Sequence, residues 1–159
     1  MVKKINYSEG DCFSIPLREG GFARGVVARM NEEGIVFGYF FGPKIEEFTG
    51  LYVDDLRPEQ AILSGQFGDL GLLNEEWKVI GKVPDWSRGR WAMPSFLRFN
   101  EGVSTGFLST YDEDSLKCIN EKKIKLSEIN VRDFPKDSVM GYGFVEIKLT
   151  KLLSTQIEQ

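Results

Sequence analysis

The stretch GDCFSIPL at residues 10–17, followed by FARGVVAR at residues 22–29, decides the fold. Apolar side chains in the first part alternate with smaller or polar ones, the period of two that turns one face of a strand inward. Pro16 has no backbone N–H, so we expect this strand at the edge of a sheet. Because a Gly-Gly pair separates the two stretches, a turn with positive φ is available there. The chain is therefore predicted to open as an antiparallel β-meander.

The segments that follow continue a β-rich pattern. The apolar run GIVFGYFF at residues 34–41 is typical of a central strand buried on both faces, with residues 26–30 as its hairpin partner. Further strands are predicted at residues 66–72 and 77–83. Acidic residues favour a short helix at residues 57–64.

The second half predicts a hairpin, a charged strand edge and a helix. Residues 96–100 and 105–109 flank a Glu-Gly turn, and the lysines at residues 122–125 are typical of a protected sheet edge. Apolar residues at helical spacing predict a helix at residues 138–153. We expect a β-rich α+β domain over residues 1–159, with a strongly bent antiparallel sheet or partly open small barrel of roughly six to eight strands and a C-terminal helix.

The predicted core is the set of apolar positions that these elements turn inward. It consists of Phe13, Ile15, Val26, Val36, Phe37, Phe40, Trp77, Ile80, Phe96 and Leu149. A domain of this length buries roughly 70% of its unfolded surface, so we expect it to fold without a disulfide or a metal.

Charge and composition limit the classes of function. The formal net charge is −4, which argues against a general nucleic-acid binder and against binding to anionic membranes. The chain has no histidine, so it lacks the commonest general base and the commonest metal ligand. It also contains no nucleotide-binding glycine loop. We predict no catalytic residue, no metal site and no cofactor.

The cysteines and the N-terminal segment bear on the compartment. Cys12 and Cys118 lie far apart without metal-ligand spacing, and we expect both to be free, buried thiols in a reducing cytosol. Residues 1–10 contain no apolar core of a signal peptide, and no apolar run approaches the ~18 residues of a membrane span. We expect a soluble, cytoplasmic protein.

A loop at residues 84–94 is the first candidate binding site. It contains Trp86, Arg88, Arg90 and Trp91, and large apolar residues in a loop need a reason. The tryptophans fit either a lid over the core or a contact surface. Because tryptophan and arginine dominate binding hot spots, we expect this loop to face a partner.

An acidic turn is the alternative candidate. Asp112, Glu113 and Asp114 follow one another directly, and such runs are usually solvated surface. They would steer a basic partner toward the protein and speed association. Catalysis by carboxylates alone is the least supported function, because adjacent acids on loops are seldom catalytic.

Three blocks, taken in order, resemble a known family. The first is the stretch at residues 10–29 and the third is GYGFVEIKL at residues 141–149. The central block consists of WKVIG at residues 77–81 with Pro84, Trp86, Trp91, Pro94, Phe96 and Arg98. Together they resemble the bacterial immunity protein 26 family of polymorphic toxin systems, with no match between residues 105 and 132.

The resemblance implies a protein that binds and neutralises a cognate toxin by occlusion, with no enzymatic activity. It also implies that the toxin gene directly precedes the gene for this chain. The alternative is a small-barrel module that binds nucleic acid or another ligand through the tryptophan and arginine loop. Nucleic-acid binding would weaken steeply with added salt, which separates the two hypotheses.

Overall fold

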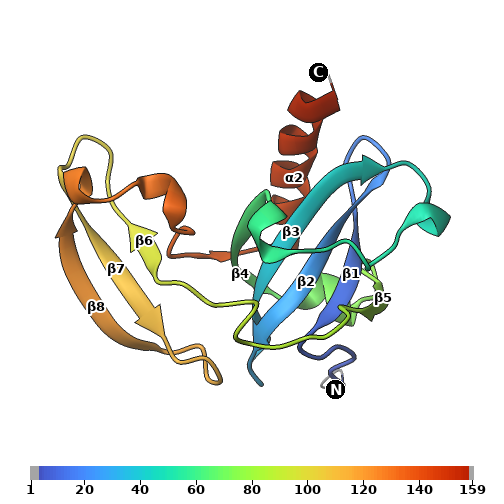
Figure 1. The fold of residues 1–159 in the computed structure, drawn as a ribbon, viewed down its shortest axis with the longest axis horizontal. Helices are drawn as coiled ribbons and strands as arrows, with labels where there is room; N and C mark the ends of the chain where they lie inside the picture. Colours follow the sequence, from blue (N-terminus) through green and yellow to red (C-terminus); the bar gives the residue numbers. More distant parts are fainter. Residues whose placement is uncertain (1–3, 158–159) are drawn as a thin grey trace.

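The computed structural model describes residues 4–157 (Figure 1). Within them, nine strands form two sheets. The large sheet has the strand order β5-β1-β2-β3-β4-β9, and the small sheet has the order β6-β7-β8. In Figure 1 the small sheet stands to the left of the large one, and helix α2 crosses one face of the large sheet.

The large sheet is antiparallel except at one edge, where β9 runs parallel to β4. Its strands are β1 (Asp11–Pro16), β2 (Phe22–Met30), β3 (Ile35–Ile45), β4 (Leu63–Gly68), β5 (Val79–Lys82) and β9 (Val139–Met140). The small sheet is wholly antiparallel and consists of β6 (Phe96–Arg98), β7 (Thr105–Tyr111) and β8 (Cys118–Lys125).

In the described part of the chain, two α-helices and four short 3-10 helices connect or cover the strands. They are η1 (Phe48–Gly50), η2 (Pro58–Gln60), α1 (Leu70–Leu73), η3 (Leu126–Glu128), η4 (Val131–Asp133) and α2 (Tyr142–Ile157). The fold is thus β-rich with a C-terminal helix, as the sequence predicts. Neither sheet closes into a barrel, and the strand count exceeds the predicted range.

Trp77 lies at the centre of the main core, between the large sheet and α2. Its ring stacks on Phe13 at 5.4 Å, and its indole N–H donates to Glu146 of α2 at 2.9 Å. Helix α2 buries Val145 and Leu149 against the same cluster. Nine of the ten predicted core residues are buried, and Ile80 is the exception because it is only half-buried.

A second layer of apolar residues joins the two sheets. Phe37 of β3 and Phe96 of β6 meet edge to face with ring centroids 5.5 Å apart, and Phe96 also contacts Tyr111 of β7. These contacts place the small sheet against the face of the large sheet opposite α2. The loop at residues 84–94 lies at this junction, since Trp86 and Met93 pack on the same cluster.

Several local predictions are wrong. β1 lies between β5 and β2, not at an edge, although β5 is short and Pro16 has a strand partner only on the β2 side among the described residues. The predicted helix at residues 57–64 is only the turn η2, because β4 begins at Leu63. The strand predicted at residues 66–72 ends at Gly68 and continues as α1.

The prediction of two buried thiols holds for one cysteine. Cys12 is fully buried in β1, whereas Cys118 is exposed. The reason is that β8 is the outer strand of the small sheet, and almost every side chain along it faces solvent.

Candidate functional site

The two candidate sites of the sequence come together in space. Arg88 of the loop donates to Glu9 at 2.8 Å and to Asp114 of the acidic turn at 2.8 Å. Arg90 of the same loop pairs with Glu59 at 2.9 Å. We call this surface the charged patch, and its members are Glu9, Glu59, Arg88, Arg90, Glu113 and Asp114.

Arg29 of β2 is the buried support of the charged patch. Its side chain is 1% exposed and lies 2.5 Å from the carboxylate of Glu113. It also donates to the backbone carbonyls of Ala28, Arg88 and Trp91. A buried charge needs such partners, so one guanidinium ties the loop and the acidic turn to the central sheet.

Trp91 belongs to the core. It is 2% exposed, and its ring meets Tyr39 at 5.4 Å and Phe41 at 5.9 Å. Trp86 is half-buried and lies against Trp91 with ring centroids 5.9 Å apart. Of the two alternatives left open by the sequence, Trp91 is therefore a lid over the core, and Trp86 is the tryptophan that still reaches the surface.

Gly10 explains how Trp86 approaches the sheet so closely. Its φ is +88°, and a Cβ atom at this position would lie 2.8 Å from the Trp86 ring. Only glycine combines this backbone conformation with that contact at no steric cost.

The acidic turn divides its three carboxylates between different tasks. Asp112 accepts hydrogen bonds from the backbone N–H groups of Asp114 and Ser115, and these bonds hold the pKa of Asp112 below its usual value. Glu113 turns inward to Arg29, while the side chain of Asp114 is 80% exposed. Asp112 thus shapes the turn, and Asp114 is the carboxylate most available to a partner.

The charged patch has an excess of acid. Its members contribute four carboxylates and two guanidinium groups, and the Glu9 carboxylate raises the pKa of Arg88 further above its ordinary value. Beside it lies a shallow hollow of about 320 Å³, lined by Arg29, Arg88, Gly89, Ala92, Met93 and Glu113. The arrangement presents hydrogen-bonding and charged groups on a loop that Arg29 holds in place, groups of the kind found at the polar rim of protein interfaces.

Two further features are absent from residues 4–157. No group of three or more Cys, Asp or Glu side chains there is arranged to hold a metal ion. None of the helices in this part of the chain is long and apolar enough to cross a membrane.

Sequence reasoning missed Arg29 and Glu9. The signal for Arg29 was present, because an arginine inside a strand with apolar neighbours on both sides must find acceptors when the strand is buried. Glu9 gave no signal, since it meets Arg88 across 79 positions of sequence.

Comparison with known proteins gives one match. The family model described as Immunity protein 26 matches residues 8–107, well over half of the chain. The matched region includes β1 to β6, Arg29 and the whole loop at residues 84–94, and it excludes the acidic turn and α2. No curated protein and no solved structure matches.

Proposed function

Because the chain belongs to the immunity protein 26 family, we propose that it binds a cognate toxin protein and neutralises it by covering the toxin's working surface. The family match is the observation that carries this proposal. Occlusion requires shape and charge complementarity and no catalytic residues.

We place the contact at the charged patch. Asp114, Glu59 and Glu113 have side chains that are 80%, 58% and 53% exposed, so they can meet cations on a partner. Such a surface suits a basic toxin and accelerates its association at low salt. Arg90, which is 53% exposed, and the half-buried Trp86 would anchor the centre of the contact.

The nucleic-acid alternative has less support. Stacking on bases needs an aromatic ring whose face is open, yet Trp91 is buried and the half-buried Trp86 lies against both Gly10 and Trp91. The acidic excess of the charged patch would also repel phosphates.

The experiment pairs this protein with the protein encoded directly upstream of its gene. We expect the parent chain to restore growth of bacteria that express this toxin, and to bind it in calorimetry. A charge-reversal variant that carries Asp114→Lys and Glu59→Lys should associate more slowly and bind more weakly. The matched control variant carries Glu19→Lys and Glu47→Lys. Glu19 and Glu47 are exposed residues outside the charged patch.

Two results would count against the proposal in different ways. A parent chain that neither binds the toxin nor restores growth contradicts the function itself. Patch and control variants that bind equally well contradict only the placement of the contact.

A further inference from the structure

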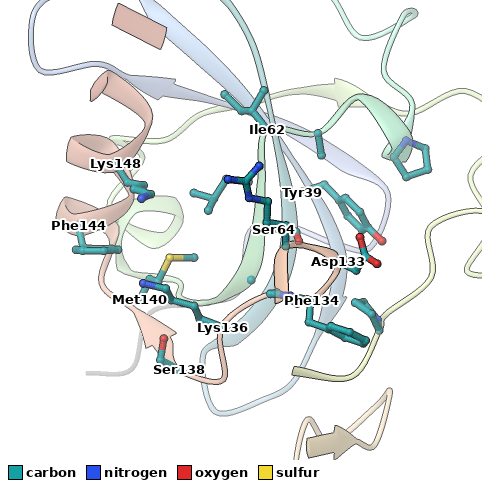
Figure 2. A pocket seen from close by; sticks show the side chains of 17 residues that line it. Tyr39, Ile62, Ser64, Asp133, Phe134, Lys136, Ser138, Met140, Phe144 and Lys148 are labelled. Atoms are coloured by element: carbon teal, nitrogen blue, oxygen red, sulfur yellow. The ribbon is translucent and has the colours of Figure 1, made fainter. Parts of the chain in front are cut away.

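A groove of about 630 Å³ opens at the outer edge of β4 (Figure 2). Figure 2 shows Phe144 and Lys148 on the α2 side, Ser64 on β4 with Ile62 just before the strand, and Phe134 and Lys136 on the segment that leads to β9. We call it the β4 groove.

Among the described residues, the edge of β4 at the floor of the β4 groove has a strand partner over only part of its length. β4 pairs with β3 along its whole length, but β9 covers its other side only at Gln66 and Phe67. Residues 63–65 therefore have no strand partner on that side within the described chain. An open edge of this kind is a template for another extended chain.

The direction of the free backbone groups follows from the alternation of the strand. Backbone N–H groups of an antiparallel strand point to alternate sides, and that of Asp69 donates to Gly34 on the β3 side. The backbone N–H groups of residues 67, 65 and 63 also point toward β3, because these residues lie two, four and six positions before Asp69. The N–H and C=O of Ser64 thus point outward, in line with Gln66, which faces β9.

The walls of the β4 groove are basic, although the chain as a whole is acidic. Arg132, Lys136 and Lys148 line it together with a single carboxylate, Asp133. None of the three cations forms an ion pair within residues 4–157. Arg88 and Arg90 of the charged patch, by contrast, are paired.

Apolar surface accompanies these charges. Phe144 is 54% exposed, and Ile62, Leu63 and Met140 also line the β4 groove. Basic and apolar side chains are thus mixed along the β4 groove, so an extended segment that carries both acidic and apolar side chains can meet the cations with the former and contact the apolar surface with the latter.

We propose that the β4 groove binds an extended acidic segment of the toxin, which adds to the large sheet as a strand beside residues 63–65. This inference rests on the proposed function and adds a second contact. The two surfaces are neighbours, because Met93 lines the hollow of the charged patch and Pro94 lines the β4 groove. Pairing with a second copy of this chain is disfavoured, since it would bring two sets of the three groove cations together.

The test uses the upstream-encoded toxin and three variants. Lys136→Glu with Lys148→Glu reverses two groove cations, and Lys122→Glu with Lys123→Glu makes the same charge change on exposed positions of β8. Ser64→Pro removes the outward N–H and leaves in place the N–H groups of residues 63 and 65 that face β3, a replacement that an edge strand tolerates. Circular dichroism and urea unfolding of each variant establish that it is folded.

We expect the groove reversal to raise the Kd for the toxin by at least about tenfold and the β8 reversal to change it by less than about twofold. Ser64→Pro should weaken binding as well. In the parent chain, hydrogen exchange of the Ser64 amide should slow when the toxin is added, and this measurement needs no variant.

Three results would overturn the inference. If the parent binds the toxin but Ser64 exchanges equally fast in both states and the groove reversal binds like its control, the toxin contacts another surface and the proposed function stands. If the parent does not bind the toxin, both proposals fail. If the parent is a dimer in solution that Ser64→Pro dissociates, the occupant is a second copy.

Discussion

Replacing Arg29 by methionine tests whether this one buried side chain holds the charged patch in place. Methionine fills much of the same volume without a charge, and the Glu113 carboxylate that loses its partner is 53% exposed, so no unpaired ion is left buried. The change removes the hydrogen bonds to the carbonyls of Ala28, Arg88 and Trp91 and the pairing with Glu113.

The expected cost follows from these bonds. A buried hydrogen bond contributes about 0.5–1.5 kcal/mol net, and the three carbonyl acceptors together account for about 2–4 kcal/mol. The Glu113 pairing adds less than a fully buried pair would, because the carboxylate is 53% exposed and screened by water. We expect Arg29→Met to reduce the free energy of unfolding by about 2–4 kcal/mol.

Urea unfolding followed by tryptophan fluorescence measures this loss, with hydrogen exchange reporting on residues 86–94. Arg90→Met is the matched control, since Arg90 pairs with Glu59 at the exposed surface and should leave the midpoint unchanged. A parent-like midpoint for Arg29→Met, or an equal loss in both variants, would refute the assignment of Arg29 as the support.

Three further predictions concern the core, the thiols and the turn. Trp77→Ala should destabilise the fold by about 3–5 kcal/mol in urea unfolding, because it empties a buried site and leaves Glu146 without its indole donor; an unchanged midpoint would contradict this. A thiol reagent should modify Cys118 at once and Cys12 only after unfolding, since burial raises the pKa of Cys12 to about 12; two equally fast thiols would be the contrary result. Folding lowers the pKa of Asp112 from its ordinary value of 3.8. The ionised carboxylate therefore stabilises the fold at pH values above 3.8, and this stabilisation is lost as the pH falls through the pKa of the folded state. Asp112→Asn should therefore make stability less dependent on pH in the acid range, and an unchanged acid profile would count against it.

Local sequence patterns correctly predicted the strands and the helix face that local interactions determine. The alternation of apolar residues in β1 and the apolar run of β3 correctly indicated strands, and the spacing of Val145 and Leu149 indicated the buried face of α2. These signals survive because one face of each element is buried and the period of that burial is visible in the sequence.

The arrangement of the strands could not be predicted in the same way. Nothing local to β1 shows that β5, more than sixty residues later, pairs on its other side. For β8 the alternation of side chains did not predict burial, because both faces of this outer strand meet solvent. Cys118 is therefore exposed on either face. The splitting of the strands into two sheets depends on contacts such as Phe37 with Phe96.

The candidate site could likewise be predicted only in part. Residue types alone identified the loop with Trp86, Arg88 and Arg90 and the turn with Asp114, but treated the two as alternatives. The loop and the turn form one surface because side chains far apart in the sequence contact each other. Arg29, for example, pairs with Glu113, 84 positions later. Charge type is visible in a sequence, whereas charge pairing is not.

The central claim is neutralisation by stoichiometric binding, and a titration tests it most directly. The upstream-encoded toxin is held at a fixed concentration, the parent chain is added in increasing amounts, and the remaining toxin activity is measured after short and long incubation. Occlusion predicts that activity falls in proportion to the added protein, ends at one equivalent and does not change with incubation time. Progressive inactivation by a small fraction of an equivalent, or full activity in the presence of excess protein, would contradict the account.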